Sequence, residues 1–248
     1  MNGYNPVFTI VTVTLNCNAL LERTIESVGK QEFVDYEYIV VDGGSTDGSI
    51  DTIKRHEKDI TSWSSERDAG IYDAMNKAAQ KARGKWIIYL NAGDTFCSSG
   101  VLSVVADRLE GSDLDVLYGD IMKMRDGAWA LVPAHEPQNY HHMFFCHQAA
   151  FVRTELMREQ PFERRFRYSA DFYLFKKCLK DGRRFLHLNE AIACYDTSGV
   201  SNREREKALC ENMAVVKELD RGLERCVFLF RLRFTVLGVK LRHAFKNK

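Results

Sequence analysis

The chain has 248 residues, of which 45% are hydrophobic and 28% charged, and its formal net charge is +1 at pH 7. This length suits one large α/β domain, and the near-neutral charge excludes the uniformly basic surface that would indicate nucleic-acid binding. The seven cysteines are scattered without CxxC spacing, which argues against a zinc site and favours reduced thiols in a cytoplasmic setting.

The N-terminal half alternates apolar segments with amphipathic ones. No basic segment with an apolar core begins the chain, so we expect no signal peptide. Strands are expected over Phe8–Leu15, Tyr36–Val41 and Trp86–Leu90, with a short one near Ser62–Ser65. Helices are expected after the cap Asn18, from about Thr46 and over Ile71–Ala82. Strand–helix alternation with short connections predicts an α/β fold with a Rossmann-like, mostly parallel sheet and helices on both faces.

Polar loops follow three of these strands: Asn16–Asn18, Asp42–Gly48 and Asn91–Asp94. The carboxyl ends of parallel strands lie at one edge of a sheet, and ligands of open α/β sheets bind at that edge. We therefore expect the three loops to gather around one site.

The second half is predicted to contain a more varied set of elements. Helices are expected over Val101–Leu109, from Ser169 to near Gly182 and over Glu204–Leu219; strands over Asp115–Lys123, Phe185–Leu188 and Ala191–Tyr195; and loops over Pro133–His142 and Asp196–Asn202. We expect Met143–Arg153 to return to the sheet. No internal repeat or low-complexity segment is present.

Four aspartates and a histidine are candidates for chemistry, each with an ordinary structural alternative. Asp42, followed by two glycines, can accept hydrogen bonds from a nucleotide base or ribose, or can belong to an ordinary turn. Asp94 can hold a divalent cation on a diphosphate, or bond the turn backbone. Asp68 and Asp171 open helices, where acids are common as caps. A histidine in apolar surroundings such as His147 is more often a satisfied core residue.

Two nucleotide-binding motifs are absent from the sequence. The first strand is not followed by GxGxxG, which disfavours NAD and FAD. The chain also lacks GxxxxGK[ST], which excludes a P-loop ATPase.

Six sequence segments between Phe8 and Ser201 are informative when they are taken together and in this order: FTIVTVTLNCN, YIVVDGGSTDGS, SERDAGIYDAMNKA, YLNAGDTF, FCHQAAFV and YSADFYLF. Together they resemble the family 2 glycosyltransferases of GT-A fold, particularly enzymes that assemble bacterial surface polysaccharides of the colanic-acid type. The combination of DGGSTDG, GIYDAMNK and LNAGD is specific, whereas any one of them alone is weak.

The resemblance implies a role for individual residues. Those implied to bind the donor nucleotide are Thr14, Asn16, Asp42, Asp68 and Asn91. Asp94 is implied to hold Mg²⁺ or Mn²⁺ between the donor phosphates, and Asp171 to be the catalytic base. His147, Gln148 and Ser201 are candidate substrate-binding residues.

The sequence departs from the family pattern at three positions. The family's strand-end motif is usually Asp-x-Asp or Asp-x-Asp-Asp, but Asn91 stands at the first acid and Gly93 at the middle position, so Asp94 is the carboxylate that remains. A Mg²⁺ that keeps its waters and binds substrate phosphates needs only one or two carboxylates, so metal-dependent activity is still expected. Ala170 stands where many members have Glu before the catalytic Asp.

The implied activity is inverting, metal-dependent transfer of a sugar from a UDP or GDP type donor. The acceptor is a hydroxyl of a polyprenyl-diphosphate-linked saccharide, at the cytoplasmic face of the membrane, in exopolysaccharide, capsule or O-antigen synthesis. The loop Asp196–Asn202 is a candidate lid. One alternative is a non-catalytic nucleotide-sugar-binding protein of the same fold. Another, a nucleotidyltransferase, needs a glycine-rich, basic loop that Asn16–Asn18 does not offer.

The expected organisation is a GT-A domain over residues 1–221, with a nucleotide-sugar-binding half at 1–118 and an acceptor-binding half at 119–221. Residues 222–248 form a helical tail with seven Lys and Arg and one Glu, rich in Phe, Leu and Val. Such a basic, apolar segment favours peripheral contact with an anionic membrane. The alternative is a packed helix with a solvated basic end.

Overall fold

The computed structural model describes residues 5–125, 127–195 and 204–246; the predicted loop Asp196–Asn202, with Ser201, lies outside the described residues. The strands are β1 (Phe8–Thr14), β2 (Tyr36–Asp42), β3 (Ser62–Ser65), β4 (Trp86–Tyr89), β5 (Thr95–Phe96), β6 (Val116–Arg125), β7 (Ala128–Val132), β8 (Ala150–Arg153) and β9 (Phe185–Tyr195). The α-helices are α1 (Asn18–Gly29), α2 (Ser49–Arg55), α3 (Ile71–Lys81), α4 (Val101–Leu109), α5 (Thr154–Glu159), α6 (Ala170–Lys180), α8 (Arg205–Leu219) and α9 (Gly222–Lys246). Short 3₁₀ turns lie at Glu57–Asp59 and His147–Ala149.

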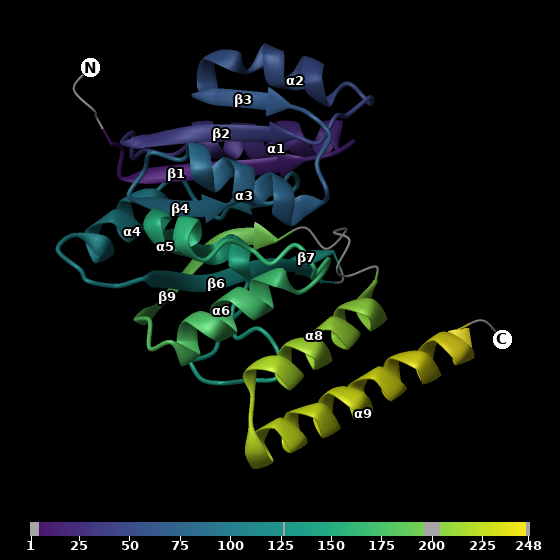
Figure 1. Cartoon of the computed structure of the whole chain (residues 1–248). Coiled ribbons are helices and arrows are strands. Elements are labelled where there is room, and N and C mark those ends of the chain that lie inside the picture. The colour runs from purple at the N-terminus through teal and green to yellow at the C-terminus, as the bar shows by residue number, and fades with distance from the viewer. Residues whose placement is uncertain (1–4, 126, 196–203, 247–248) are drawn as a thin grey trace.

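The described strands form one sheet in the order β3-β2-β1-β4-β8-β6-β9-β5, with β7 paired to β6 (Figure 1). The first four strands are parallel, as predicted, because a helix crosses over between them. The rest of the sheet contains both parallel and antiparallel pairs, and the sequence did not predict the antiparallel ones. β8 lies antiparallel between β4 and β6, since it follows a loop and not a crossover helix.

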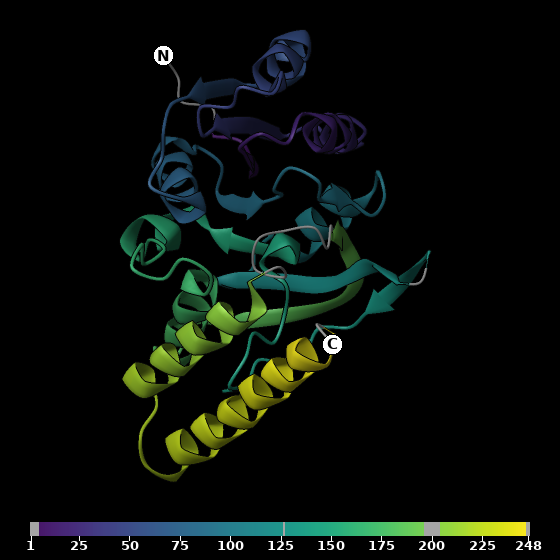
Figure 2. The ribbon, with the colours of Figure 1, turned by 90° about the vertical axis from the view of Figure 1, so that its right-hand side faces the viewer.

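Alternating side chains of the buried strands divide the core into two clusters, one on each sheet face. On β1, Val11 and Val13 join the cluster that includes residues of α3, α5, α6 and α8, whereas Phe8 and Ile10 join the cluster with α1, α2 and α4. The helices therefore cover both faces of the sheet, as Figure 2 shows along its edge. The predicted α/β architecture is confirmed.

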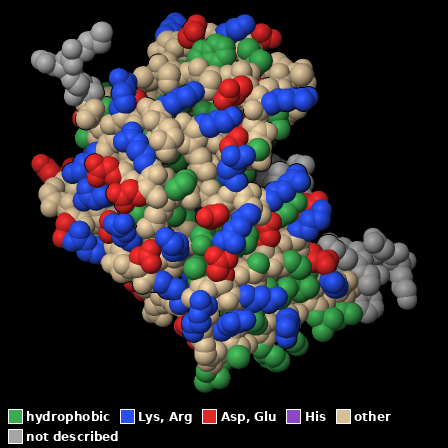
Figure 3. Space-filling model, in the orientation of Figure 1, with side chains coloured by type: hydrophobic (Ala, Val, Ile, Leu, Met, Phe, Trp, Pro, Cys, Tyr) green, Lys and Arg blue, Asp and Glu red, His purple; other side chains and the backbone are tan. Residues whose placement is uncertain are grey.

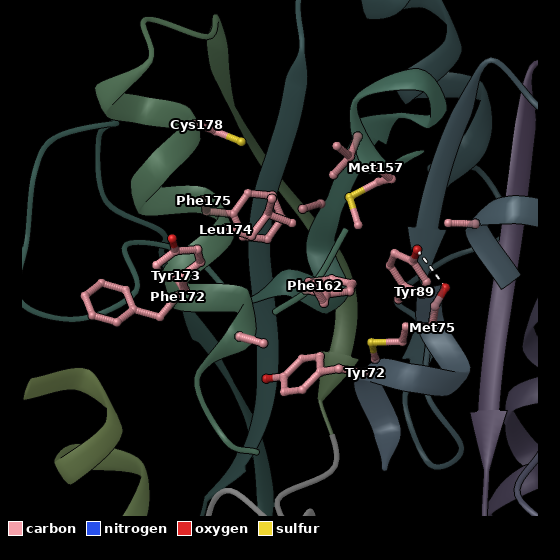
Figure 4. Packing of buried hydrophobic residues seen from close by; sticks show 14 of the residues in the cluster. Tyr72, Met75, Tyr89, Met157, Phe162, Phe172, Tyr173, Leu174, Phe175 and Cys178 are labelled. Carbon is pink, nitrogen blue, oxygen red and sulfur yellow. Dashed lines mark hydrogen bonds between the residues drawn. The ribbon is translucent and has the colours of Figure 1, made fainter. Parts of the chain in front are cut away.

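Aromatic side chains fill the cluster between α3, α5 and α6 (Figure 4). Phe162 packs against both Tyr72 and Tyr89, with ring centroids 5.1 and 5.5 Å apart. The Tyr89 hydroxyl donates to the Met75 carbonyl at 3.2 Å. This packing joins β4 to α3 and fixes Tyr72 at the edge of the cluster.

Two predicted helix starts differ from the structure. Asn18 is the first residue of α1 and not its cap; its N–H donates to Asp47 Oδ2 at 2.9 Å. Asp47 also accepts from the Ser49 N–H at 3.0 Å, so α2 begins at Ser49 and not near Thr46. One carboxylate thus serves the starts of two helices.

The C-terminal half contains elements that the sequence did not predict. The short β5, the β6–β7 hairpin and α5 were missed. The two strands predicted over Phe185–Leu188 and Ala191–Tyr195 form a single strand, β9, because an irregularity opposite Gly119 and Asp120 absorbs the intervening residues. The predicted helical tail is α9, and no helix within the described ranges is long and apolar enough to cross a membrane.

Candidate active site

The ends of β1, β2 and β4 lie side by side, as predicted. Thr14 and Asp42 are partners in the β1–β2 register. After β4, the Ala92 N–H donates to the Val13 carbonyl at 3.2 Å, and after β3 the Glu66 N–H donates to the Asp42 carbonyl at 3.0 Å. Four loops therefore meet at one edge of the sheet.

Asp42 is fully buried at this edge, and its two carboxylate oxygens have different surroundings. Oδ2 accepts from the N–H groups of Gly44 (3.0 Å) and Ser45 (2.9 Å) and from the Ser65 hydroxyl (2.6 Å). Oδ1 has no hydrogen-bond partner among the described residues, and neither has the buried Thr14 hydroxyl on the adjacent strand. Buried polar atoms are almost always satisfied, so this pair is suited to polar atoms of a ligand.

Asn16 connects two of the loops. Its Oδ1 accepts from the Thr46 N–H at 2.8 Å, and its own N–H donates to the Ser45 hydroxyl at 2.8 Å. This side chain therefore shapes the edge around Asp42.

Asp68 makes the turn contact that its sequence position suggested and also approaches the Asp42 loop. Its Oδ1 accepts from the Gly70 N–H at 2.8 Å, just before α3. Its Oδ2 lies 2.8 Å from the point that a Cβ on Gly43 would occupy. A side chain at position 43 would therefore push the Asp68 carboxylate away from this loop.

The turn Asn91–Asp94 explains one departure from the family motif. Gly93 has φ 105°, a left-handed conformation that favours glycine over any acid. The Thr24 hydroxyl accepts from the Gly93 N–H at 2.9 Å and donates to the Asp94 carbonyl at 2.8 Å, which fixes the turn on α1. Asp94 is 3% exposed, and Asn91 Oδ1 is buried without a hydrogen-bond partner in the described structure.

Asp171, in the first turn of α6, is held by three donors. Oδ1 accepts from the Tyr72 hydroxyl (3.0 Å) and the Phe172 N–H (2.8 Å), and Oδ2 lies 2.9 Å from His147 Nδ1. Burial opposes ionisation, but the hydrogen bond and charge of His147, followed by the Phe172 and Tyr72 donors, hold the pKa of Asp171 below its usual value. The carboxylate is thus ionised at neutral pH, and its side chain is still 16% exposed.

His147 bridges Asp171 and the Asn91 turn. Its Nε2 lies 3.4 Å from Asn91 Nδ2, a donor, so the hydrogen-bond network assigns the proton to Nδ1, which donates to Asp171. The neighbouring Gln148 is buried and accepts from the Cys146 thiol. Although His147 lies in apolar sequence, it is a member of a polar chain that reaches the site.

Cys146 directly precedes His147, whose ring contacts Asp171. Burial, and then the negative charges of Asp94 and Asp171, raise the pKa of its thiol. Two surface cavities of about 430 Å³ lie elsewhere, one against α1 and Thr95–Ser99 and the other against Glu159–Arg165.

The site offers few protein ligands for a metal ion. Over residues 5–125, 127–195 and 204–246, no group of three or more His, Cys, Asp and Glu side chains could hold one. The Asn91–Asp94 turn offers one carboxylate and the unpartnered amide oxygen of Asn91. These donors fit a hard cation that takes most of its ligands from phosphates and water, and not a cation bound by protein alone.

Tyr72 is the site residue that sequence reasoning missed. It lies within the GIYDAMNK segment on which the resemblance depends, but no charge or spacing marked it. Its hydroxyl contact with Asp171 joins positions 99 residues apart. Only the packing of α3 against α6 reveals that contact.

The family model described as glycosyl transferase family 2 matches residues 9–183. Among curated proteins, a PGL/p-HBAD biosynthesis glycosyltransferase of Mycobacterium bovis is 30% identical over 241 residues, covering 91% of this chain and 90% of its own. A Bacillus subtilis relative named for teichuronic acid biosynthesis, TuaG, is 25% identical over 230 residues, covering 89% and 91%.

Solved structures share the fold at low sequence identity. S. aureus TarS 1–349 in complex with UDP-GlcNAc has a TM-score of 0.71 at 16% identity, covering 91% of this chain and 71% of that chain. A mannosyltransferase from Pyrobaculum calidifontis in complex with GDP-Man and Mn²⁺ has a TM-score of 0.70 at 16% identity, covering 94% and 70%.

Proposed function

Because the chain belongs to glycosyl transferase family 2 and is therefore a glycosyltransferase, we propose that it transfers a sugar, with inversion, from a nucleotide-diphosphate sugar to a saccharide hydroxyl in bacterial surface-polysaccharide synthesis. The observation that carries this proposal is the chain of contacts Asp171–His147–Asn91. It connects an ionised carboxylate with the turn that offers oxygen ligands to a cation.

The donor nucleotide binds at the ends of β1 and β2. Asp42 Oδ1 is an acceptor without a partner in the described structure, so it calls for a ligand N–H or hydroxyl group. The imide N–H of uracil and the ring N–H of guanine both meet this need, as does a ribose hydroxyl. Thr14 is the strand partner of Asp42, the Asp68 carboxylate approaches the neighbouring Gly43, and Asn16 shapes the loop. The relatives of the same fold that bind UDP-GlcNAc and GDP-Man support both types of donor.

Asp171 is the general base of a single displacement. The acceptor hydroxyl oxygen bonds to the anomeric carbon as the bond from that carbon to the diphosphate breaks. The hydroxyl proton passes to Asp171, and the bonding electron pair leaves with the diphosphate. His147 and Tyr72 orient the carboxylate and keep it ionised, while Oδ2 retains a lone pair for the proton.

Asp94 and Asn91 hold Mg²⁺ or Mn²⁺ together with the donor diphosphate. When bound, the cation neutralises charge that grows on the leaving group. The Mn²⁺ in the Pyrobaculum mannosyltransferase structure supports a divalent ion of this kind. The turn, tied to α1 through Thr24, positions both oxygen ligands before the donor arrives.

The acceptor is a lipid-linked saccharide at the cytoplasmic face of the membrane. We assign residues 1–118 to donor binding, 119–221 to acceptor binding and 222–248 to a tail whose helix α9 packs on the core by one face. Tyr72 and Asp171 come from the two halves and meet at the reacting carboxylate. Of the other predicted substrate-binding residues, Gln148 is buried beside Cys146 and supports the wall of the site.

A transfer and donor-hydrolysis assay with and without Mn²⁺ tests this function. A thermal-shift screen of UDP, GDP, CDP and dTDP first identifies the nucleotide, because a ligand that binds the folded state raises Tm by mass action. We expect UDP or GDP to raise Tm in the presence of Mn²⁺, and the matching sugar donor to turn over. Binding without any turnover of the donor or its transfer to saccharides favours the alternative, a non-catalytic nucleotide-sugar-binding protein.

A further inference from the structure

The outward face of α9 carries a continuous apolar stripe. Its members, spaced alternately by four and three residues, are Leu223 (81% exposed), Val227 (38%), Phe230 (71%), Phe234 (72%), Leu237 (52%) and Leu241 (51%). At 3.6 residues per turn this spacing keeps all six on one side of the helix. In Figure 3 hydrophobic side chains gather along the lower edge of the molecule, where Figure 1 places α9.

This stripe is not the face by which α9 packs on the protein. Phe228 and Leu232 are 8% and 1% exposed and belong to the main core, with Leu229 against it. Lys176 Nζ lies 5.0 Å from the centre of the Phe228 ring. The helix is therefore anchored by its inner face and presents a second apolar face to solvent. Exposed apolar surfaces of this kind mark interaction sites.

Cations lie on both flanks of the stripe. At about 100° per residue, Arg233 and Lys240 lie roughly a quarter-turn to one side of it, and Arg231 roughly a quarter-turn to the other; all three are exposed. Glu224 is the single acidic residue in the sequence of α9. The three basic residues Arg231, Arg233 and Lys240 therefore lie on the two sides of the apolar stripe of α9.

These flanking charges distinguish the partners that the stripe could accept. Its spacing is also that of a two-stranded coiled coil, in which flanking positions of the two helices face one another. In a pair of α9 helices those positions would bring like charges together, which opposes association. An anionic lipid surface satisfies both features, since its acyl layer accepts the apolar side chains and its headgroups attract the cations.

We propose that the outer face of α9 docks in the plane of an anionic lipid surface. Phe230 and Phe234 enter the acyl boundary, and Arg231 and Arg233 lie among the headgroups. In Figures 1 and 2 α9 runs toward the side of the molecule where β1, β2 and β4 end. The inference goes beyond the proposed function, because it rests on α9 alone.

Vesicle co-sedimentation of the full chain tests the proposal. We expect binding to phosphatidylglycerol vesicles to exceed binding to phosphatidylcholine vesicles and to weaken as salt screens the charges. Phe230→Ser with Phe234→Ser lowers the binding constant at least about tenfold, and Arg231→Gln and Arg233→Gln each lower it about fivefold. The matched control is Val34→Ser with Leu131→Ser, which removes exposed apolar side chains elsewhere and leaves binding unchanged.

Two results overturn the proposal. One is unchanged vesicle binding of the double Phe variant with an unchanged Tm. The other is a dimer, seen by light scattering, that this variant dissociates, since the stripe then binds a second copy. Transfer to a water-soluble acceptor is measured in parallel. If neither the parent nor any variant transfers sugar to this acceptor, the proposed function is challenged. If transfer persists while vesicle binding is lost, only the interaction of α9 with lipid is affected.

Discussion

The imidazole of His147 lies with Nδ1 2.9 Å from Oδ2 of Asp171, and its other nitrogen faces the side-chain amide of Asn91. This relationship places one histidine between the proposed base and the proposed cation turn. It links residues from the 3₁₀ turn before β8, from α6 and from the loop after β4. Each end of the link leads to a prediction.

Asp171→Asn should lower kcat by about 10²–10⁴-fold, because the amide cannot take the acceptor proton. The Kd for donor nucleotide should stay within about twofold, since Asp171 lies outside the β1–β2 edge where the nucleotide is proposed to bind. Single-turnover kinetics and calorimetry measure the two quantities. Near-normal turnover in this variant would show that another group is the base.

His147→Gln should move the acidic limb of the pH–rate profile to higher pH. Of the contacts that lower the pKa of Asp171, those of His147 are the largest, whereas burial raises this pKa. Without the imidazole the pKa of Asp171 therefore rises. Because a base acts only when deprotonated, activity is then lost at a higher pH as the solution is acidified. The control His56→Gln changes a histidine on the surface beside Glu22 and should leave the profile in place. If kcat of His147→Gln falls equally at every pH and the acidic limb does not move, His147 does not keep Asp171 ionised.

Gly43→Ala should weaken donor binding about tenfold, or about 1.4 kcal/mol. The added Cβ would lie 2.8 Å from Asp68 Oδ2 and 3.4 Å from Leu15 Cδ1, so the Asp68 carboxylate must move away from the Asp42–Gly43 loop. Isothermal titration with the preferred nucleotide measures the loss. Gly100→Ala is the matched control, since a Cβ there meets no atom within 4 Å, and it should leave the affinity unchanged.

Local sequence patterns predicted what depends on local sequence. The predictions of β1, β2 and β4 and of the polar loops after them are confirmed. Strands buried on both faces appear as runs of consecutive apolar residues, and turns as consecutive polar residues and glycine. Contacts between distant segments could not be predicted this way. The Tyr72–Asp171 bond and the β8 pairing depend on how α3, α6 and the sheet pack, and no period in the sequence encodes that packing.

The role of His147 shows the same limit in one residue. An apolar context predicted a core histidine, and its neighbours Phe144 and Phe145 are indeed buried. Its ring, however, is turned toward Asp171, and this orientation depends on α6, more than 20 residues away along the chain. For α9, the sequence predicted a basic, apolar helix, but only packing against the core reveals which apolar face stays exposed.

Asp220→Ala should destabilise the fold by about 3–5 kcal/mol, as loss of a buried ion-pair partner does. Asp220 is fully buried at the end of α8, and Lys176 and Lys180 each place Nζ 2.9 Å from its carboxylate. Lys176, itself 2% exposed, then keeps a buried charge without its counter-ion. Urea denaturation measures the change. Glu26→Ala, which breaks an exposed pair with Lys30, should cost less than about 1 kcal/mol.

The contribution of Asp220 to the free energy of unfolding should depend on pH. Burial opposes its ionisation, but Lys180, Asn139 and Lys176 together hold the pKa of Asp220 below its usual value. A carboxylate with a lowered pKa in the folded state stabilises the fold above its unfolded pKa, near 4, and this contribution disappears as the pH falls through the folded pKa. The stability difference between parent and Asp220→Ala should therefore shrink as the pH falls below about 4. A stability difference that stays constant as the pH falls below about 4 and through the folded pKa would contradict the assignment.

Asn91→Asp tests why an amide stands in the cation turn. The new carboxylate should tighten binding of Mn²⁺ in the presence of nucleotide about tenfold, since affinity for hard cations rises with ligand charge. It also removes the Nδ2 donor that faces His147 Nε2 and places a second carboxylate beside the imidazole that contacts Asp171. The contact that orients the imidazole toward Asp171 is then lost, so kcat should fall although the metal binds more tightly. Mn²⁺ titration and steady-state kinetics separate the two effects, with the exposed Asn189→Asp as the control for added charge. Unchanged Mn²⁺ affinity would remove the turn as the cation site, whereas a higher kcat would show that the contact between Asn91 and His147 is dispensable.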